Sequence, residues 1–150
     1  MTNIGNLNEN QGYLRLFEKM LNILMKDGKK KVARKLFKNA LTIASSKVDK
    51  SESFIFQKAL HNLSPDVKIQ NKRVGSTTYQ IPVALTEEQK LNRGIKILVA
   101  TAKLRKERTM EDRLALEIID AFNQRGLTIK KKDEIHKLAE ANKSYAHFSW

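Results

Sequence analysis

The stretch from Val67 to Val83 predicts one β-hairpin in a chain whose other apolar residues recur at helical spacing. Apolar and polar residues alternate after Val67, Gly75 marks a turn, and β-branched and aromatic residues follow from Thr77. Period-two alternation on both sides of such a turn is typical of a hairpin, because Gly adopts positive φ without steric cost. A lone two-stranded ribbon is marginal in water. The helices must therefore supply the core. The ribbon has three basic residues and no acidic one, so it packs on the edge of the helices or on a partner that accepts positive charge.

The overall charge points to a polyanionic partner. The 150 residues carry a formal net charge of +13, with a pI near 10.0, and a hydrophobic content of 41% suits one globular domain. Nucleic acid is favoured over a membrane, because the sequence has no run of 18 apolar residues and no lipid-anchor motif. The absence of cysteine excludes disulfides, thiolate metal sites and cysteine nucleophiles.

Residues 1–12 are polar, Asn-rich and aperiodic, and we expect them to form a flexible tail. They match neither a secretory signal, which needs a basic start and an apolar stretch, nor an Arg-rich transit peptide. We therefore expect the protein to act where it is made, or after an import segment has been removed.

Helical periodicity predicts a mainly α fold, a single domain of about six helices over residues 13–150. One projecting β-hairpin, at about 67–83, lies between helices three and four. The helices are expected at 13–25, 30–48, 52–63, from 86 to a basic cluster at 103–108, at 110–125 and after Lys132. Thr86 and Gln89 have the spacing of a capping box. The buried faces are expected to include Val32, Phe54 and Leu138.

The second predicted helix carries an unusual concentration of cations. From Lys26 to Lys50 the sequence has nine basic and two acidic residues. Three lysines, at positions 29–31, fall in the first turn, where the helix dipole disfavours cations. A solvated basic face is the ordinary explanation, but this placement makes more sense if phosphates dock at that end of the helix. The cluster at 103–108 suits a helix C-terminus and RNA equally well.

Nothing in the sequence predicts an enzyme, a cofactor or a metal site. The three histidines are not at metal-ligand spacing, and no nucleophile elbow, Gly-rich dinucleotide loop or kinase motif is present. Glu117 and Asp120 share a face of the acidic fifth helix, for which a solvated surface is the favoured interpretation. We expect this helix to face protein or solvent, away from phosphate. The aromatics and cations of the C-terminal residues 142–150 suit either stacking on bases or anchoring of the last turn in the core.

Four segments in order resemble small-subunit ribosomal protein seven, in its bacterial and organellar form. They are MKDGKK at Met25–Lys30; RVG followed by TYQIP in the hairpin; the block from Met110 through Leu114, Ala115, Glu117, Asp120 and Ala121; and LAEAN with SYAHFSW at Leu138–Trp150. The resemblance covers nearly the whole chain.

The resemblance implies a helical protein with a projecting ribbon that binds the head (three-prime major) domain of the small-subunit rRNA. It further implies that the protein helps to nucleate head assembly, touches neighbouring ribosomal proteins and lies near the messenger and the exit-site tRNA. The candidate rRNA-binding residues are Lys29, Lys30, Arg34, Lys35, Arg73, Gly75, Tyr79, Lys130, Lys131, His136, Lys143, His147 and Trp150. The residues expected close to messenger and exit-site tRNA are Arg73, Val74, Gly75, Ser76, Tyr145 and Phe148.

The chain departs from the family pattern in three places. Ser76 stands where a second Gly is usual, Ile97 stands where a Trp is common, and a neutral segment replaces the basic N-terminal arm of bacterial members. The Lys, Asn and Ile richness and this divergence favour an organellar ribosome, expected to be mitochondrial, with the bacterial cytoplasm or a plastid as alternatives. A free-standing basic helical regulator that binds nucleic acid is the alternative function. It would need a face of base-reading side chains, whereas the basic surfaces here are mostly Lys.

Overall fold

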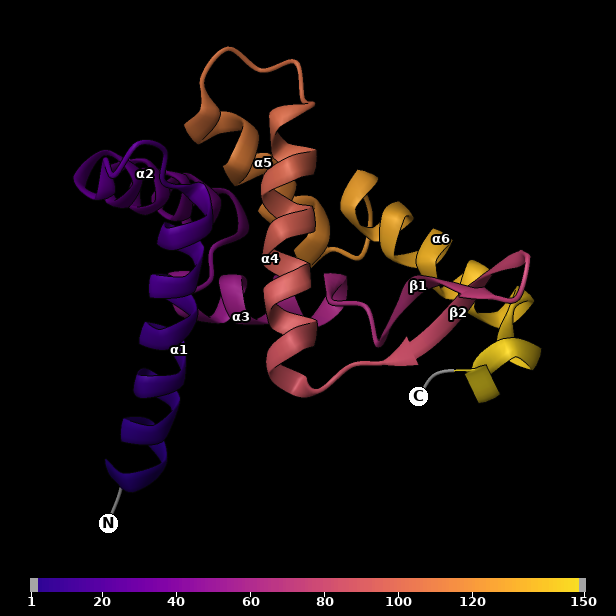
Figure 1. Ribbon diagram of the computed structural model, residues 1–150. Coiled ribbons are helices and arrows are strands. Elements are labelled where there is room, and N and C mark those ends of the chain that lie inside the picture. Colours follow the sequence, from indigo (N-terminus) through magenta and orange to yellow (C-terminus); the bar gives the residue numbers. More distant parts are fainter. Residues whose placement is uncertain (1–2, 149–150) are drawn as a thin grey trace.

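The computed structural model describes residues 3–148, with side chains described for residues 11–147. The described chain confirms the predicted class: it is mainly α, with six α-helices and one antiparallel hairpin between the third and fourth (Figure 1). The elements are α1 (Asn3–Leu24), α2 (Lys30–Val48), α3 (Glu52–Leu63), β1 (Val67–Val74), β2 (Thr77–Ala84), α4 (Glu87–Lys103), α5 (Met110–Phe122), α6 (Leu127–Ala141) and the 3₁₀ helix η1 (Lys143–Phe148). Among the described residues, none of the helices combines the length and the apolar character needed to cross a bilayer.

Helix α5 lies at the centre of the helical body. It packs against α2, α3 and α4, and its residues Leu114, Ala115 and Ile118 are fully buried. The hairpin lies apart from α1 and α2, beside α6 and η1 (Figure 1). The molecule therefore consists of a helical body and a lateral extension formed by α6, the hairpin and η1.

The hairpin has the predicted two strands, in a register that pairs Val67 with Ala84 and Val74 with Thr77. Two residues, Gly75 and Ser76, form the turn. Gly75 has φ +66, and Ser76 is not among the described non-glycine residues with positive φ. Positive φ only at the first central position matches a type II′ turn, which explains why serine is accepted at the second. Ile81 is buried, so the ribbon does have an apolar anchor.

Two helices begin earlier than the sequence predicts. Helix α1 starts at Asn3 and not at Tyr13, so residues 3–12 of the predicted tail are helical; their flexibility stays a prediction. A segment without apolar periodicity can extend a helix that packing has already nucleated, because elongation costs far less than nucleation. Helix α6 starts at Leu127 and not after Lys132. Gly126, with φ +95, precedes it directly.

Three residues predicted in the core are exposed. The exposed fractions of Val32, Phe54 and Leu138 are 61%, 47% and 44%. In α2 the buried stripe is shifted by one position and consists of Ala33, Phe37, Ala40, Leu41 and Ala44. In α3, Phe56 is buried, whereas the ring of Phe54 packs on Phe122 with centroids 5.9 Å apart. Several adjacent apolar residues in each helix allow more than one stripe, and packing against α5 selects one.

A network of polar side chains, which we call the polar seam, joins α6 to the helical body. The prediction that Glu117 and Asp120 form a solvated acidic surface is therefore wrong for Glu117. Glu117 is fully buried; one of its oxygens accepts from the backbone N–H and hydroxyl of Thr128, and the other from Arg105 at 2.9 Å. Arg105 also donates to Asp120 at 2.9 Å, and the Thr128 hydroxyl meets that of Thr101 at 2.6 Å. These contacts satisfy both buried oxygens of Glu117, which holds the first turn of α6 in place through Thr128.

Gly94 lies where α4 crosses α3. A Cβ at this position would lie 2.5 Å from Ser64 Oγ and 2.9 Å from Leu63 Cδ1. A Cβ at Gly12, inside α1, would meet nothing within 4 Å. The close approach of α3 and α4 therefore depends on the missing side chain at Gly94.

We predict that Gly94→Ala lowers the free energy of unfolding by about 1–3 kcal/mol through overpacking. Gly12→Ala, the matched control, should raise it by about 0.5–1 kcal/mol, because alanine loses less backbone entropy in a helix. Urea unfolding of the two variants measures the difference. Equal stability of both variants would contradict the packing at the α3–α4 crossing.

Candidate nucleic-acid interface

One exposed face of α2 gathers four cations. Lys31, Arg34, Lys35 and Lys38 follow the i, i+3, i+4, i+7 spacing of one helical face, and with Asn39 they line a shallow cavity of about 290 Å³. No carboxylate lines this cavity. In the part of the chain that the structure describes, Lys31, Lys35 and Lys38 make no ion pair. We call these four side chains the α2 basic face.

At the start of α2, where the sequence predicts docking of phosphates, two cations already have a carboxylate partner within the protein. Lys30 donates to Glu18 of α1 at 2.8 Å, and Arg34 lies 3.7 Å from the same carboxylate. The hydrogen bond from Lys30 lowers the pKa of Glu18 below its usual value, and the charges of Lys30 and Arg34 add to this effect. Lys29 is the N-cap residue and makes no side-chain capping bond. Two of the predicted phosphate-binding cations are therefore partly neutralised within the protein.

The hairpin and the C-terminal residues, predicted separately, lie together. The rings of Tyr79 in β2 and Tyr145 in η1 have centroids 4.9 Å apart. Together with Asn71, Thr77 and Asn142, among others, they line a cavity of about 550 Å³. At the tip, Arg73 is exposed and its Nε donates to the Gly75 carbonyl at 3.2 Å; Gly75 and Ser76 are exposed and Val74 is half-buried.

The remaining predicted residues are spread along α6 and η1. Lys130 is exposed and Lys131 half-buried. His136 Nε2 accepts from the Asp66 N–H at 3.1 Å, so this histidine joins α6 to the start of β1. Lys143 pairs with Glu140 at 2.8 Å, and His147 is exposed. The side chain of Phe148, and Trp150 as a whole, lie outside the described residues.

Lys31 and Lys38 belong to the α2 basic face but were not among the predicted site residues. The signal was present in the sequence, because Lys38 lies four residues after Arg34 and Lys31 four residues before Lys35. The basic face thus runs from Lys31 in the first turn to Lys38 in the third.

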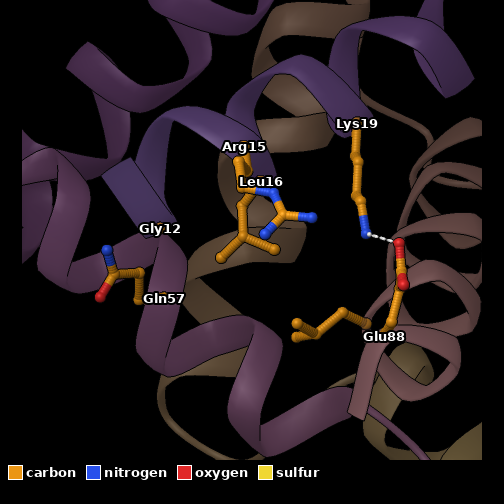
Figure 2. Close-up of a pocket in the computed structure, with 7 residues that line it drawn as sticks. Gly12, Arg15, Leu16, Lys19, Gln57 and Glu88 are labelled. Carbon is orange, nitrogen blue, oxygen red and sulfur yellow. Dashed lines mark hydrogen bonds and ion pairs between the residues drawn. The ribbon is translucent and has the colours of Figure 1, made fainter. Parts of the chain in front are cut away.

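A third concave surface lies between α1, α3 and α4 (Figure 2). It measures about 450 Å³ and is lined in part by Arg15, Leu16, Gln57 and Leu91. Lys19 donates to Glu88 at 3.1 Å across it, as the dashed line in Figure 2 marks, and this bond lowers the pKa of Glu88. No group of three or more His, Asp or Glu side chains that could hold a metal ion occurs in the described chain.

The sequence is similar to known ribosomal proteins. A family model described as "Ribosomal protein S7p/S5e" matches residues 5–143. A protein named small ribosomal subunit protein uS7 from Geotalea uraniireducens (strain Rf4) is 43% identical over 136 residues, which are 91% of this chain and 87% of the relative. Proteins of the same name from Mycoplasma mobile and Symbiobacterium thermophilum are 42% and 44% identical; the alignments cover 88% and 90% of this chain, and 85% and 86% of the relatives.

We predict that replacing Lys31, Lys35 and Lys38 with Ala flattens the dependence of log affinity for RNA on log salt by roughly two units, at about 0.7–0.9 per lost phosphate contact. The control removes the same charge from exposed sites elsewhere, with Lys47, Lys50 and Lys96 replaced by Ala. Binding of both variants is measured over a salt series. An equal change in slope for the two variants would mean that net charge, and not the α2 basic face, drives binding.

A second prediction concerns Glu18. Because its carboxylate pairs with Lys30 and Arg34, Glu18→Gln frees two cations and should tighten RNA binding and steepen its salt dependence. Glu88→Gln removes a comparable exposed ion pair, with Lys19, and should leave both quantities unchanged. The same salt series measures both. Weaker binding of the Glu18 variant would show that the pair orients the cations for RNA.

Proposed function

The chain belongs to the ribosomal protein S7p/S5e family, and we propose that it is a structural constituent of the small ribosomal subunit that binds the subunit's rRNA directly. Its partners are then this rRNA and neighbouring small-subunit proteins. The family is a structural class, and we propose no catalytic role for this chain.

The observation that carries direct rRNA binding is the α2 basic face. Four cations share one helical face and line a cavity without a carboxylate, and three of them, Lys31, Lys35 and Lys38, are exposed. Such a surface attracts phosphate. Lysine is a mobile point charge that follows a phosphate backbone without reading bases. The rRNA contacts proposed for Lys29, Lys30, Arg34 and Lys35 extend this surface to the start of α2.

We further propose that the bound rRNA is the head (three-prime major) domain, and that the protein helps to nucleate the assembly of the head. The hairpin tip and η1 then lie toward the messenger and the exit-site tRNA, with Arg73, Gly75 and Tyr145 closest. Support comes from the resemblance of RVG and TYQIP in the ribbon and SYAHFSW at the C-terminus to the family pattern, and from the stacking of Tyr79 on Tyr145. An aromatic pair beside exposed basic residues suits contact with single-stranded RNA.

The alternative of a free-standing regulator is less well supported. Base reading in a groove needs amide or guanidinium groups free along a helix. Asn39, the one amide that lines the cavity of the α2 basic face, donates to Glu111 at 3.2 Å. As to compartment, we propose a mitochondrial ribosome on the Lys-, Asn- and Ile-rich composition, although the relatives named above are bacterial.

The proposed role of the hairpin predicts that shortening it reduces tRNA retention without preventing assembly of the protein into small subunits. Deleting Arg73, Val74, Thr77 and Thr78 removes two cross-strand pairs and rejoins Gly75-Ser76 directly to the pair of Lys72 and Tyr79. None of the deleted residues is buried, so thermal stability should change little. The shortened protein should still co-sediment with small subunits, because α2 is unchanged, but the subunits should retain exit-site tRNA less well.

The control is Arg73→Gln, which removes the charge of the tip but keeps its length. Failure of the wild-type protein to co-sediment with small subunits at moderate salt would refute the ribosomal role itself. Normal tRNA retention and normal reading frame with the shortened ribbon would refute only the role of the tip.

A further inference from the structure

A fourth concave surface lies where the end of α1, the start of α2 and the α4–α5 connection meet. Figure 1 shows these segments at the same end of the molecule. The cavity measures about 460 Å³, within the range of small-ligand sites. Aliphatic and methionine side chains form its floor. Leu24 and Ala33 belong to the core, and Met25, Leu36 and Met110 are half-buried. Val32, which also lines it, is 61% exposed, so the apolar core reaches the surface here.

The rim of this cavity is basic on two walls. Lys26 and Lys29 come from the α1–α2 connection, and Lys103 and Arg113 come from the end of α4 and from α5. In the described chain none of the three lysines makes an ion pair, and Arg113 Nε donates to the Glu107 carbonyl. Asp27 is the one acidic residue among the lining residues. The cavity therefore combines an open apolar floor with cations from two separate elements.

We propose that this cavity receives one unstacked base of the bound RNA, with the flanking phosphates on the two basic walls. This inference rests on the proposed function. A nucleotide within an RNA chain has a base with apolar faces and a phosphate on each side. The base matches the apolar floor of the cavity, and the two phosphates match the two basic walls. Met25 and Met110 supply polarizable thioethers, which pack favourably on aromatic rings. An acidic peptide would also satisfy the charges, but Lys29 borders the α2 surface proposed to bind rRNA, which favours the nucleotide.

The test follows the methionine methyl groups of the full-length protein by NMR. A short oligoadenylate should shift the Met25 and Met110 methyl resonances through the ring current of the inserted base. An abasic ribose–phosphate oligomer of the same length should not shift them. The methyl of Met20, which is fully buried in the core, is the internal control and should not move with either oligomer.

A substitution that leaves the net charge unchanged tests whether the apolar floor contributes to binding independently of the basic rim. Val32→Asn should weaken oligoadenylate binding by about fivefold, because it removes part of the apolar contact between the base and the floor, and should leave abasic binding unchanged. Leu14→Asn is the matched control, because Leu14 is 59% exposed and lies on α1 outside this cavity. Equal weakening by both substitutions would overturn the assignment.

Four other results are decisive. Equal methyl shifts with the abasic oligomer would show that the rim binds phosphate only. Shifts with a peptide of alternating Asp and Leu, but not with oligoadenylate, would make the cavity a protein-docking groove. Unmoved methyls in a protein that still binds a head-domain rRNA fragment would refute this inference and leave the proposed function standing. Absence of binding to that fragment would refute both.

Discussion

The interaction of Arg105 with the buried carboxylate of Glu117 decides where the C-terminal third of the chain lies. Removing a carboxylate from water is costly unless charge and hydrogen bonds compensate for it. Here Arg105 compensates from the α4–α5 connection and Thr128 from the first turn of α6. Bonds to Glu107, Glu117 and Asp120 raise the pKa of Arg105 above its usual value, with Glu107 the largest cause. Arg105 therefore stays charged beside these carboxylates, and the hydrogen bonds from Thr128 to Glu117 keep α6 against α5.

The orientation of the hairpin depends on this seam. The ribbon packs along α6 and η1, and His136 accepts from the Asp66 N–H at its base. Lys132 also donates to the Asn62 carbonyl at 2.7 Å, which joins α6 to the end of α3 just before the ribbon. A two-stranded ribbon, marginal alone, is stabilised here by the burial of Ile81 and by the Tyr79–Tyr145 pair. The tip contains neither Ile81 nor the tyrosine pair, so its residues can contact a partner without loss of these stabilising interactions.

Helix α2 serves both the core and the proposed interface. Phe37 and Leu41 are fully buried on one side, and Phe37 packs on Phe17 and Phe56 at centroid distances of 4.8 and 5.0 Å. The α2 basic face occupies the other side. The burial of one face therefore fixes the helix from which the cations extend. A polyanion bound to these cations would cost little ordering of the backbone.

The sequence by itself determined the mainly α class, the position and turn of the hairpin and the capping box of Thr86 and Gln89, because these depend on residues close together in the chain. It also determined the basic character of α2, because four residues at helical spacing must share a face. Only the tertiary structure decided that Val32 is exposed and Ala33 buried, that Glu18 pairs with Lys30, and that Glu117 holds Thr128 instead of facing water. These outcomes depend on partners from other helices. The sequence shows which charged and apolar side chains are present, but the packing of the helices determines which of them come into contact.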